Sequence, residues 1–155
     1  MVFIPAHAGY APSSNYATPD RRATDVPCVD FDDTTAETYY YLSKLPDTYA
    51  GGGLTFKLTF AMTSATSGDV QFDLAFERFN TDLDSTSFSA ATAGTQTVSA
   101  TNGTPVVCTI IVTDGANMDS IAAGEMFRFS VTRNTGGSDT ATGDAELIGI
   151  SHEET

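Results

Sequence analysis

From Val26 to the end of the chain, apolar and polar residues alternate with a period of two, as they do in a strand with one buried face. The clearest run covers residues 54–62, and its apolar face would carry Leu54, Phe56, Leu58, Phe60 and Met62. A second run covers residues 70–77, with Val70, Phe72, Leu74 and Phe76 on the apolar face. The segment TSATSGD between them is rich in turn residues. We therefore expect an antiparallel pair of strands with one buried face.

Similar runs predict further strands at residues 27–32, 39–42, 95–100, 106–113, 125–133 and 145–150. The run VVCTIIV is the most continuously apolar and is a candidate for a strand covered on both sides. Between 114 and 124, DGANMDSIAAG offers a capping residue, helix formers and a final glycine, which predicts one short helical turn across one end of the sheets. About eight strands, without strand–helix–strand alternation, predict an all-β fold: an antiparallel two-sheet β-sandwich of jelly-roll type.

Residues 1–25 differ from the rest because three prolines interrupt them and no period is sustained. Proline fixes the backbone and removes a donor, so an extended N-terminal arm is predicted, followed by one sandwich domain at residues 26–155. Fully stretched, the arm would span roughly 80–90 Å, more than the width of such a domain. A mobile terminus is the alternative, although disordered tails are usually poor in aromatic residues. We expect the arm to dock on a neighbouring surface through Phe3, Ile4, Tyr10 and Tyr16.

Seven Lys and Arg residues against twenty Asp and Glu give the 155-residue chain a formal charge of -13. A surface this negative repels phosphate backbones and anionic lipid headgroups, so neither nucleic acid nor a membrane is an expected partner. Acidity also maintains solubility, and a partner with a basic patch is compatible with it. No apolar stretch approaches the roughly 20 residues of a spanning helix, and the first ten residues lack the basic start of a secretory signal. A soluble product made in the cytoplasm is expected.

Residues with evident catalytic chemistry are few. Histidine occurs only at His7 and His152, and the sequence has no nucleophile elbow, phosphate-binding loop or dinucleotide fingerprint. The glycine-rich AGGGLT at 50–55 enters a strand and is interpreted as a turn. We predict that the protein is not an enzyme and has no catalytic residue, cofactor or metal. Glycoside hydrolysis needs only two carboxylates at a suitable separation, and spacing along the chain does not test that alternative.

Acidic residues gather in two segments, VDFDD and NTDLDS. Their carboxylates could offer oxygen ligands to a cation such as Ca²⁺; the residues are Asp30, Asp32, Asp33, Asp82 and Asp84. Neither segment has the spacing of a helix–loop–helix calcium site, and close acidic pairs arise by chance in so acidic a chain. Solvated loop acids are the favoured interpretation.

Three further features have two interpretations each. Tyr39, Tyr40 and Tyr41 could supply an aromatic platform for a carbohydrate, but strand alternation lets at most two point outward, and a role in the core or an interface is favoured. Cys28 and Cys108 lie in apolar runs, where reduced core thiols are favoured over a disulfide. The triplet NGT at 102–104 matches a glycosylation acceptor, but Asn-Gly is a strong hairpin signal and a turn is favoured.

Seven segments, in their order along almost the whole chain, resemble a family of small virion proteins encoded by tailed bacteriophages: SNYAT, DFDDTTAE, YAGGGLT, SATSGDV, AFER, AAGEMFRFSVTR and TATGDAELIGI. The resemblance implies a β-sandwich structural protein of the virus particle, such as a capsid decoration or cement protein, often a trimer. It implies no catalytic residue, and it does not identify which part of the virion the protein occupies.

These observations lead to the hypothesis of a non-enzymatic virion structural protein, made in the host cytoplasm. It would be a homotrimer on the outer surface of the particle that binds the major capsid protein, or another virion protein, through the arm and one end of the sandwich. Many weak contacts on a lattice would gain strength through multivalency. The alternatives are a receptor- or glycan-binding module of a tail fibre or spike, and the subunit of a self-assembling extracellular filament.

Overall fold

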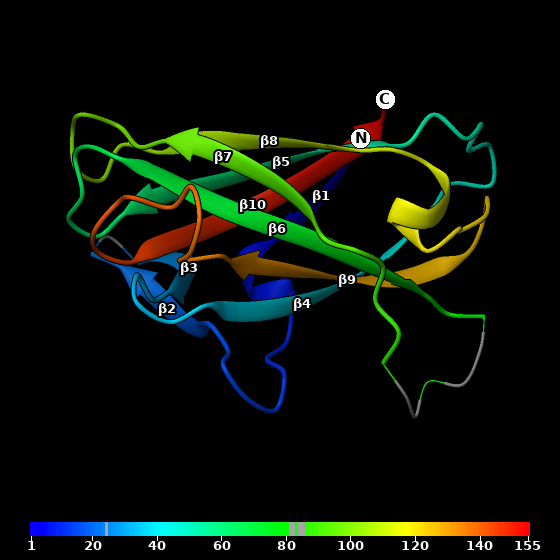
Figure 1. Ribbon diagram of the computed structural model, residues 1–155, viewed down its shortest axis with the longest axis horizontal. Coiled ribbons are helices and arrows are strands. Elements are labelled where there is room, and N and C mark those ends of the chain that lie inside the picture. The colour runs from blue at the N-terminus through cyan, green and yellow to red at the C-terminus, as the bar shows by residue number, and fades with distance from the viewer. Residues whose placement is uncertain (24, 81–82, 84–85) are drawn as a thin grey trace.

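The computed structural model describes residues 1–23, 25–80, 83 and 86–155, which form ten strands in two antiparallel sheets packed face to face (Figure 1). The predicted all-β, two-sheet sandwich is confirmed. Two 3-10 turns, η1 (Ala6–Ala8) and η2 (Gly115–Met118), are the helical elements of the described residues. No helix in that part of the chain is long and apolar enough to cross a membrane.

The first sheet has the strand order β2-β3-β10-β5-β8, and β1 pairs with the second half of β10. Its strands are β1 (Val2–Pro5), β2 (Thr18–Arg22), β3 (Val26–Phe31), β5 (Leu54–Met62), β8 (Val106–Val112) and β10 (Ala145–Glu154). The second sheet has the order β4-β9-β6-β7, with β4 (Glu37–Lys44), β6 (Asp69–Arg78), β7 (Thr92–Thr97) and β9 (Met126–Arg133). In Figure 1, β6 and β7 of the second sheet lie in front of β5 and β10 of the first.

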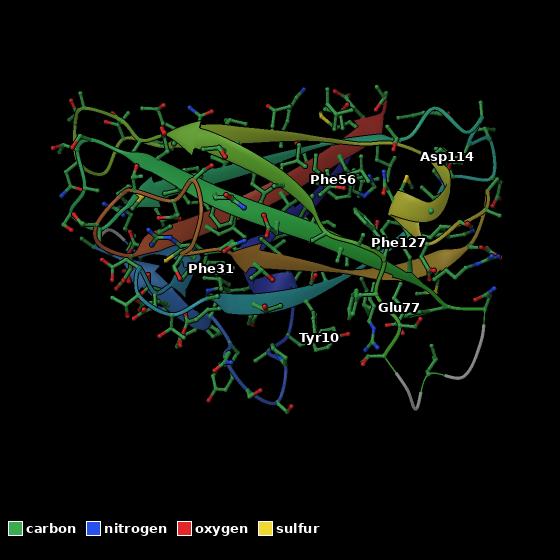
Figure 2. The ribbon with its side chains drawn as sticks, viewed as in Figure 1. Tyr10, Phe31, Phe56, Glu77, Asp114 and Phe127 are labelled. Carbon is green, nitrogen blue, oxygen red and sulfur yellow. The ribbon has the colours of Figure 1, made fainter. Side chains whose placement is uncertain are left out.

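The core lies between the sheets, because the residues that point inward from each strand are apolar. Phe56 on β5 packs against Phe76 on β6 with ring centroids 5.4 Å apart, and Phe60 packs against Phe72 at 5.2 Å. Figure 2 labels Phe56 among the side chains between the layers. Burial of one such phenylalanine contributes roughly 1.5–3 kcal/mol, so this aromatic layer holds the two sheets together.

The prediction that residues 54–62 and 70–77 pair with each other is wrong. These residues form β5 and β6, which lie in opposite sheets and face each other across the core. β5 pairs with β8 and β10, whereas β6 pairs with β7 and β9. A period of two identifies a buried face, but it does not distinguish a neighbour beside the strand from a neighbour across the core.

β8 is covered on one face only, which corrects the expectation from its apolar sequence. Its residues alternate between buried and solvent-facing positions, and Val107 and Ile111 are 43% and 59% exposed. β8 is an edge strand that lies beside β7 of the other sheet, where a side chain at Gly94 would collide with Ile110. The helical turn expected within 114–124 is confirmed as η2, but it ends at Met118 with Asp119 and not Gly124 as its left-handed C-cap, and Asp114 makes no side-chain capping hydrogen bond.

The described residues of the segment 1–25, expected as an arm outside the sandwich, are part of it. β1 pairs with β10 and β2 pairs with β3, so the expected boundary at residue 25 falls within one sheet. Between β1 and β2 the chain crosses to the second sheet. There Tyr10 and Tyr40 exchange two backbone hydrogen bonds of 2.9 Å, and Asn15 and Ala17 bond to Thr38. The extended backbone thus finds its partners on its own domain, and it covers part of the edge of β4, which would otherwise invite pairing with another chain.

Arg133, at the end of β9, is the largest fully buried side chain of the described residues. Its Nε and Nη2 donate to the two carboxylate oxygens of Asp139 at 3.0 and 3.1 Å. The remaining N–H groups donate to the carbonyls of Phe31, Ala141 and Gly143 at 2.9–3.2 Å. All five guanidinium donors are therefore satisfied. This buried ion pair ties the loop between β9 and β10 to β3.

Candidate functional site

The outer face of the second sheet carries a cluster of aromatic and hydrogen-bonding side chains. Cross-strand register arranges its outward residues in three rows: Thr38–Thr132–Asp73, Tyr40–Ser130–Ala75 and Leu42–Arg128–Glu77. We call these rows, together with Tyr10, Phe88, Gln71 and Asn134 beside them, the Tyr40 face. It draws on three strands and three connecting segments that are far apart in the chain.

Tyr40 is the aromatic centre of the Tyr40 face. Strand alternation buries Tyr39 and Tyr41 in the core, so one of the three consecutive tyrosines points outward. The ring of Phe88 is stacked on Tyr40 at 5.3 Å and 24°, and the ring of Tyr10 meets Tyr40 edge-on at 5.5 Å. Three aromatic rings from separate parts of the chain thus form one partly exposed cluster.

Arg128 lies against this cluster and is held by Glu77. Its guanidinium carbon is 5.1 Å from the ring centroid of Phe88 and 5.8 Å from that of Tyr40, within the range of cation–π attraction. Nε donates to the nearly buried carboxylate of Glu77. The bond to Glu77 raises the pKa of Arg128 above its usual value. Because the pair is neutral overall, Arg128 orients the rings and does not offer a free positive charge. Figure 2 shows Tyr10 and Glu77 along the lower side of the molecule.

The segment 86–89, which carries Phe88, is anchored to the sheet at two points. The N–H of Ser87 donates to Oε1 of Glu77 at 2.7 Å. The N–H of Ser89 donates to the carbonyl of Phe76 at 2.8 Å, and Oγ of Ser89 accepts from the N–H of Phe76 at 3.0 Å. These bonds on both sides of Phe88 hold its ring over the face.

The other end of the Tyr40 face is a floor of hydrogen-bonding groups. Asp73 accepts from Nε2 of Gln71 and from Nδ2 of Asn134 on separate oxygens, both at 2.8 Å. The hydroxyls of Thr38 and Thr132 share a hydrogen bond of 2.7 Å. A carboxylate oxygen has two acceptor positions, so each oxygen of Asp73 can accept one more hydrogen bond. Asp73 is therefore oriented by the protein and still able to receive a ligand hydroxyl.

The two histidines make contacts that serve the fold. His7 Nε2 lies 2.6 and 3.0 Å from the carbonyl oxygens of Cys28 and Asp20, which links η1 to β3 and β2. His152 is buried against Phe56, with ring centroids 5.0 Å apart, and burial lowers the pKa of its imidazole to about 4. Both cysteines are buried free thiols, and burial raises the pKa of Cys108 to about 11, as expected for a core residue.

The acidic cluster of the VDFDD segment gains a member from a distant loop. One carboxylate oxygen each from Asp32, Asp33 and Asp144 lies within 4.8 Å of the others. Asp32 accepts from the N–H and hydroxyl of Thr34 at 2.7 and 2.6 Å, which lowers the pKa of Asp32, and Asp33 accepts from the N–H of Gly143 at 2.5 Å. Three carboxylates could supply part of the six to eight oxygens that Ca²⁺ takes. Their hydrogen bonds show that Asp32 and Asp33 organise their loops.

Asp30 is separate from that cluster and lies on β3 opposite Glu146 of β10. Burial, with repulsion from Asp144 second, raises the pKa of Asp30 to about 6, and its Oδ1 has no hydrogen-bond partner among the described residues. Asp82 and Asp84, the second acidic pair, lie outside the described residues.

The four residues expected to bind a partner lie on different surfaces. Ile4 is 8% exposed and belongs to the core, because alternate residues of β1 face inward, so its side chain is not free to contact a partner. Phe3 is 66% exposed and lies against Gly149 of the first sheet. Tyr10 is 39% exposed on the Tyr40 face, and Tyr16 is 46% exposed beside the edge of β4.

Solved structures share this architecture, although no protein-family model and no curated protein sequence matches the chain. CBM35 from Cellvibrio japonicus Abf62 aligns with a TM-score of 0.60 and 10% identity over 98% of this chain and 93% of that one. The chain shares its fold with carbohydrate-binding modules. The CBM36-1 domain of a multidomain xylanase from the hindgut metagenome of Trinervitermes trinervoides has a TM-score of 0.57, with 10% identity over 99% and 97% of the two chains. A family 6 carbohydrate-binding module has a TM-score of 0.54, with 13% identity over 100% and 95%. At these identities the likeness concerns the sandwich and not the residues on its surface.

Tyr10 and Tyr40 are candidates from the sequence alone, whereas Phe88, Arg128 and Glu77 are not. Arg128 and Glu77 occupy polar positions within strongly apolar strands, which is ordinary for a sheet with one wet face. The one sequence signal for their importance is that Glu77 places a negative charge, and Arg128 a positive charge, in an otherwise apolar strand. Only the register of β6 against β9 shows that the two charges are neighbours.

Proposed function

We propose that this protein is a glycan-binding module that holds its ligand on the Tyr40 face. The observation that carries the proposal is a partly exposed cluster of Tyr10, Tyr40 and Phe88 at the border of a floor of hydrogen-bonding side chains. A sugar ring has apolar C–H groups on its faces and hydroxyls at its rim. It therefore needs an aromatic surface and, beside it, polar groups with fixed directions, a combination typical of ligand sites.

The side chains of this face are held in place before any ligand arrives. Glu77 fixes both Arg128 and the segment that carries Phe88, while two amides fix the carboxylate of Asp73. A site whose rotamers are already restrained loses less conformational entropy on binding. This supports the use of the face as a recognition surface.

The comparisons support the proposal through the fold, because the similar solved structures are carbohydrate-binding modules. Jelly-roll sandwiches also occur among lectins and viral capsid proteins. Together with the resemblance to bacteriophage virion proteins, the proposal places the module in a tail fibre or spike, where it would bind glycans of the host envelope.

A homotrimeric capsid decoration protein is the second candidate function. The outer face of the first sheet exposes Phe3, Val107 and Ile111, apolar side chains that could serve as contacts to other virion subunits. Localisation of the protein on intact particles by cryo-electron microscopy tests this candidate. Density on the head lattice would favour decoration, and density on fibres or spikes would favour the receptor-binding setting.

Affinity electrophoresis in gels that contain soluble β-glucan, xylan, mannan or bacterial envelope polysaccharide tests the glycan proposal, followed by calorimetry on any polymer that retards the protein. We expect Tyr40→Ala to weaken binding at least about tenfold, because it removes the central ring of the cluster. Phe3→Ala removes an exposed aromatic ring from the opposite sheet and is the matched control. Undiminished binding by folded Tyr40→Ala protein would contradict the proposal.

A further inference from the structure

On the Tyr40 face, the aromatic cluster around Tyr40 and the carboxylate of Asp73 lie at separate ends, and the distance between them limits which ligands can contact both. We propose that its ligand is an uncharged oligosaccharide chain that crosses the sheet diagonally from Tyr40 to Asp73, and neither a single sugar nor an acidic polysaccharide. The inference rests on the proposed function and adds the length and charge of the ligand to it.

The length follows from the strand register. Tyr40 pairs with Ser130, which pairs with Ala75, and Asp73 lies two residues before Ala75 on β6. Two inter-strand spacings of about 4.8 Å, combined with a rise of about 3.4 Å for each of two residues along the strand, place the Cα atoms of Tyr40 and Asp73 about 12 Å apart. One pyranose ring cannot pack against the aromatic cluster of Tyr10, Tyr40 and Phe88 and also donate to Asp73. A ligand that uses both ends of the face must be a chain of several sugars.

The hydroxyls on the path between these ends suit such a chain. Thr38 and Thr132 lie half-buried in the same row as Asp73 and share one hydrogen bond, whereas Ser130, in the row of Tyr40, is 8% exposed and lies beneath the surface. Each hydroxyl can both donate and accept a hydrogen bond. Side chains in the middle of the path can therefore form hydrogen bonds with the hydroxyls of a bound sugar, which lose their bonds to water on binding.

The charge of the ligand follows from the ion pairs on the face. Arg128 is neutralised by Glu77, and Lys44 at the end of β4 lies 3.3 Å from Asp47. Asp73 has amide partners only, so its negative charge is not balanced by a cation among its contacts. A uronate or sulfate would meet this carboxylate on a chain of net charge -13, and the described residues place no free cation on the path to bind it. An uncharged chain avoids that repulsion and can donate hydroxyls to Asp73.

The inference is tested by calorimetry with defined oligosaccharides. The uncharged probes are cellotetraose, xylotetraose, laminaritetraose and mannotetraose, each with its monosaccharide, and the charged probes are tetragalacturonate and a heparin-derived tetrasaccharide. We expect at least one uncharged tetrasaccharide to bind, its monosaccharide to bind at least tenfold more weakly, and neither charged probe to bind. Asp73→Asn should weaken binding by about ten- to hundred-fold, as for loss of a hydrogen bond to a charged group. Asp25→Asn changes the net charge equally at an exposed site and should leave the affinity unchanged.

Each other outcome overturns a defined part of the account. Equal affinity for a monosaccharide, tight binding of a charged probe at this face, or full affinity in Asp73→Asn would overturn the inference while glycan binding itself stands. If no oligosaccharide and no polysaccharide binds, the proposed function fails, and the inference fails with it.

Discussion

Replacement of Arg133 by methionine tests how far the fold depends on one buried ion pair. The substitution keeps an unbranched apolar side chain but removes five donated hydrogen bonds. It leaves the carboxylate of Asp139, which is 3% exposed, without its counter-charge inside the protein. Removal of one partner from a buried ion pair costs about 3–5 kcal/mol, since the other charge stays buried and unpaired.

That cost is a large share of the 5–15 kcal/mol by which domains are usually stable. For a chain of this size, about 2–4 °C of melting temperature corresponds to each kcal/mol, so Arg133→Met should melt roughly 6–20 °C lower. The assays are thermal melting for this shift and urea unfolding for the free energy, both followed by far-ultraviolet circular dichroism because the chain has no tryptophan. Arg133→Lys keeps the charge but loses the planar fork, and it should lie between wild type and Arg133→Met.

A double-mutant cycle separates the ion pair from the rest of the packing. Arg133→Met combined with Asp139→Asn removes both charges, and it should cost clearly less than the sum of the two single changes. A loss below about 1 kcal/mol in Arg133→Met, or strict additivity in the cycle, would refute the reasoning that the pair anchors the loop between β9 and β10.

Four other changes have defined outcomes. Burial makes the folded state hold the Asp30 proton more tightly than the unfolded state, so stability falls as pH rises from 3.8 to about 6; Asp30→Asn should stabilise by about 1–2 kcal/mol at pH 7.5 in urea melts, with no gain at about pH 3.5. The buried imidazole of His152 has the opposite effect, because its pKa falls from 6.5 to about 4 and stability is lost as pH falls through that window. His152→Gln should reduce this loss of unfolding free energy by about 3 kcal/mol in the same melts. Gly94→Ala should lose about 1–3 kcal/mol through overcrowding against Ile110. Calorimetric melting should show that Gly94→Ala costs less in an Ile110→Ala background than in the wild type. Deletion of residues 1–22 removes β1 and β2 and should give a protein without a cooperative melting transition, whereas a free arm could be removed without effect.

The strands of this fold can be predicted from the sequence because a period of two survives along most of them. The runs at residues 54–62 and 106–113 recur nearly unchanged as β5 and β8. Pairing cannot be predicted in the same way, because the apolar face of β5 is completed across the core by β6 and not beside it. The N-terminal segment illustrates the same limit: its prolines indicate an extended backbone, but only the tertiary structure shows that Tyr10 pairs with Tyr40 on its own domain.

The candidate site is predictable in part. Alternation along the strand shows that Tyr40 and its two tyrosine neighbours cannot all point the same way, but it does not show which of them faces out. Phe88 comes from a loop without periodicity, and Asp73 becomes distinctive only when Gln71 and Asn134 donate to it from two different segments. These relations arise from strand register and loop position, which the pattern of residues along one chain does not contain.

The central claim is that the outer face of the sheet β4-β9-β6-β7 recognises a glycan. Its most direct test is a titration of isotopically labelled protein with an uncharged tetrasaccharide that binds, followed by two-dimensional NMR of the backbone amides. The account predicts chemical-shift changes that are concentrated on β4, β9 and β6 around Tyr40, Ser130 and Asp73, with the first sheet unaffected. Changes confined to the first sheet, or to the loop that contains Asp32 and Asp33, would contradict it.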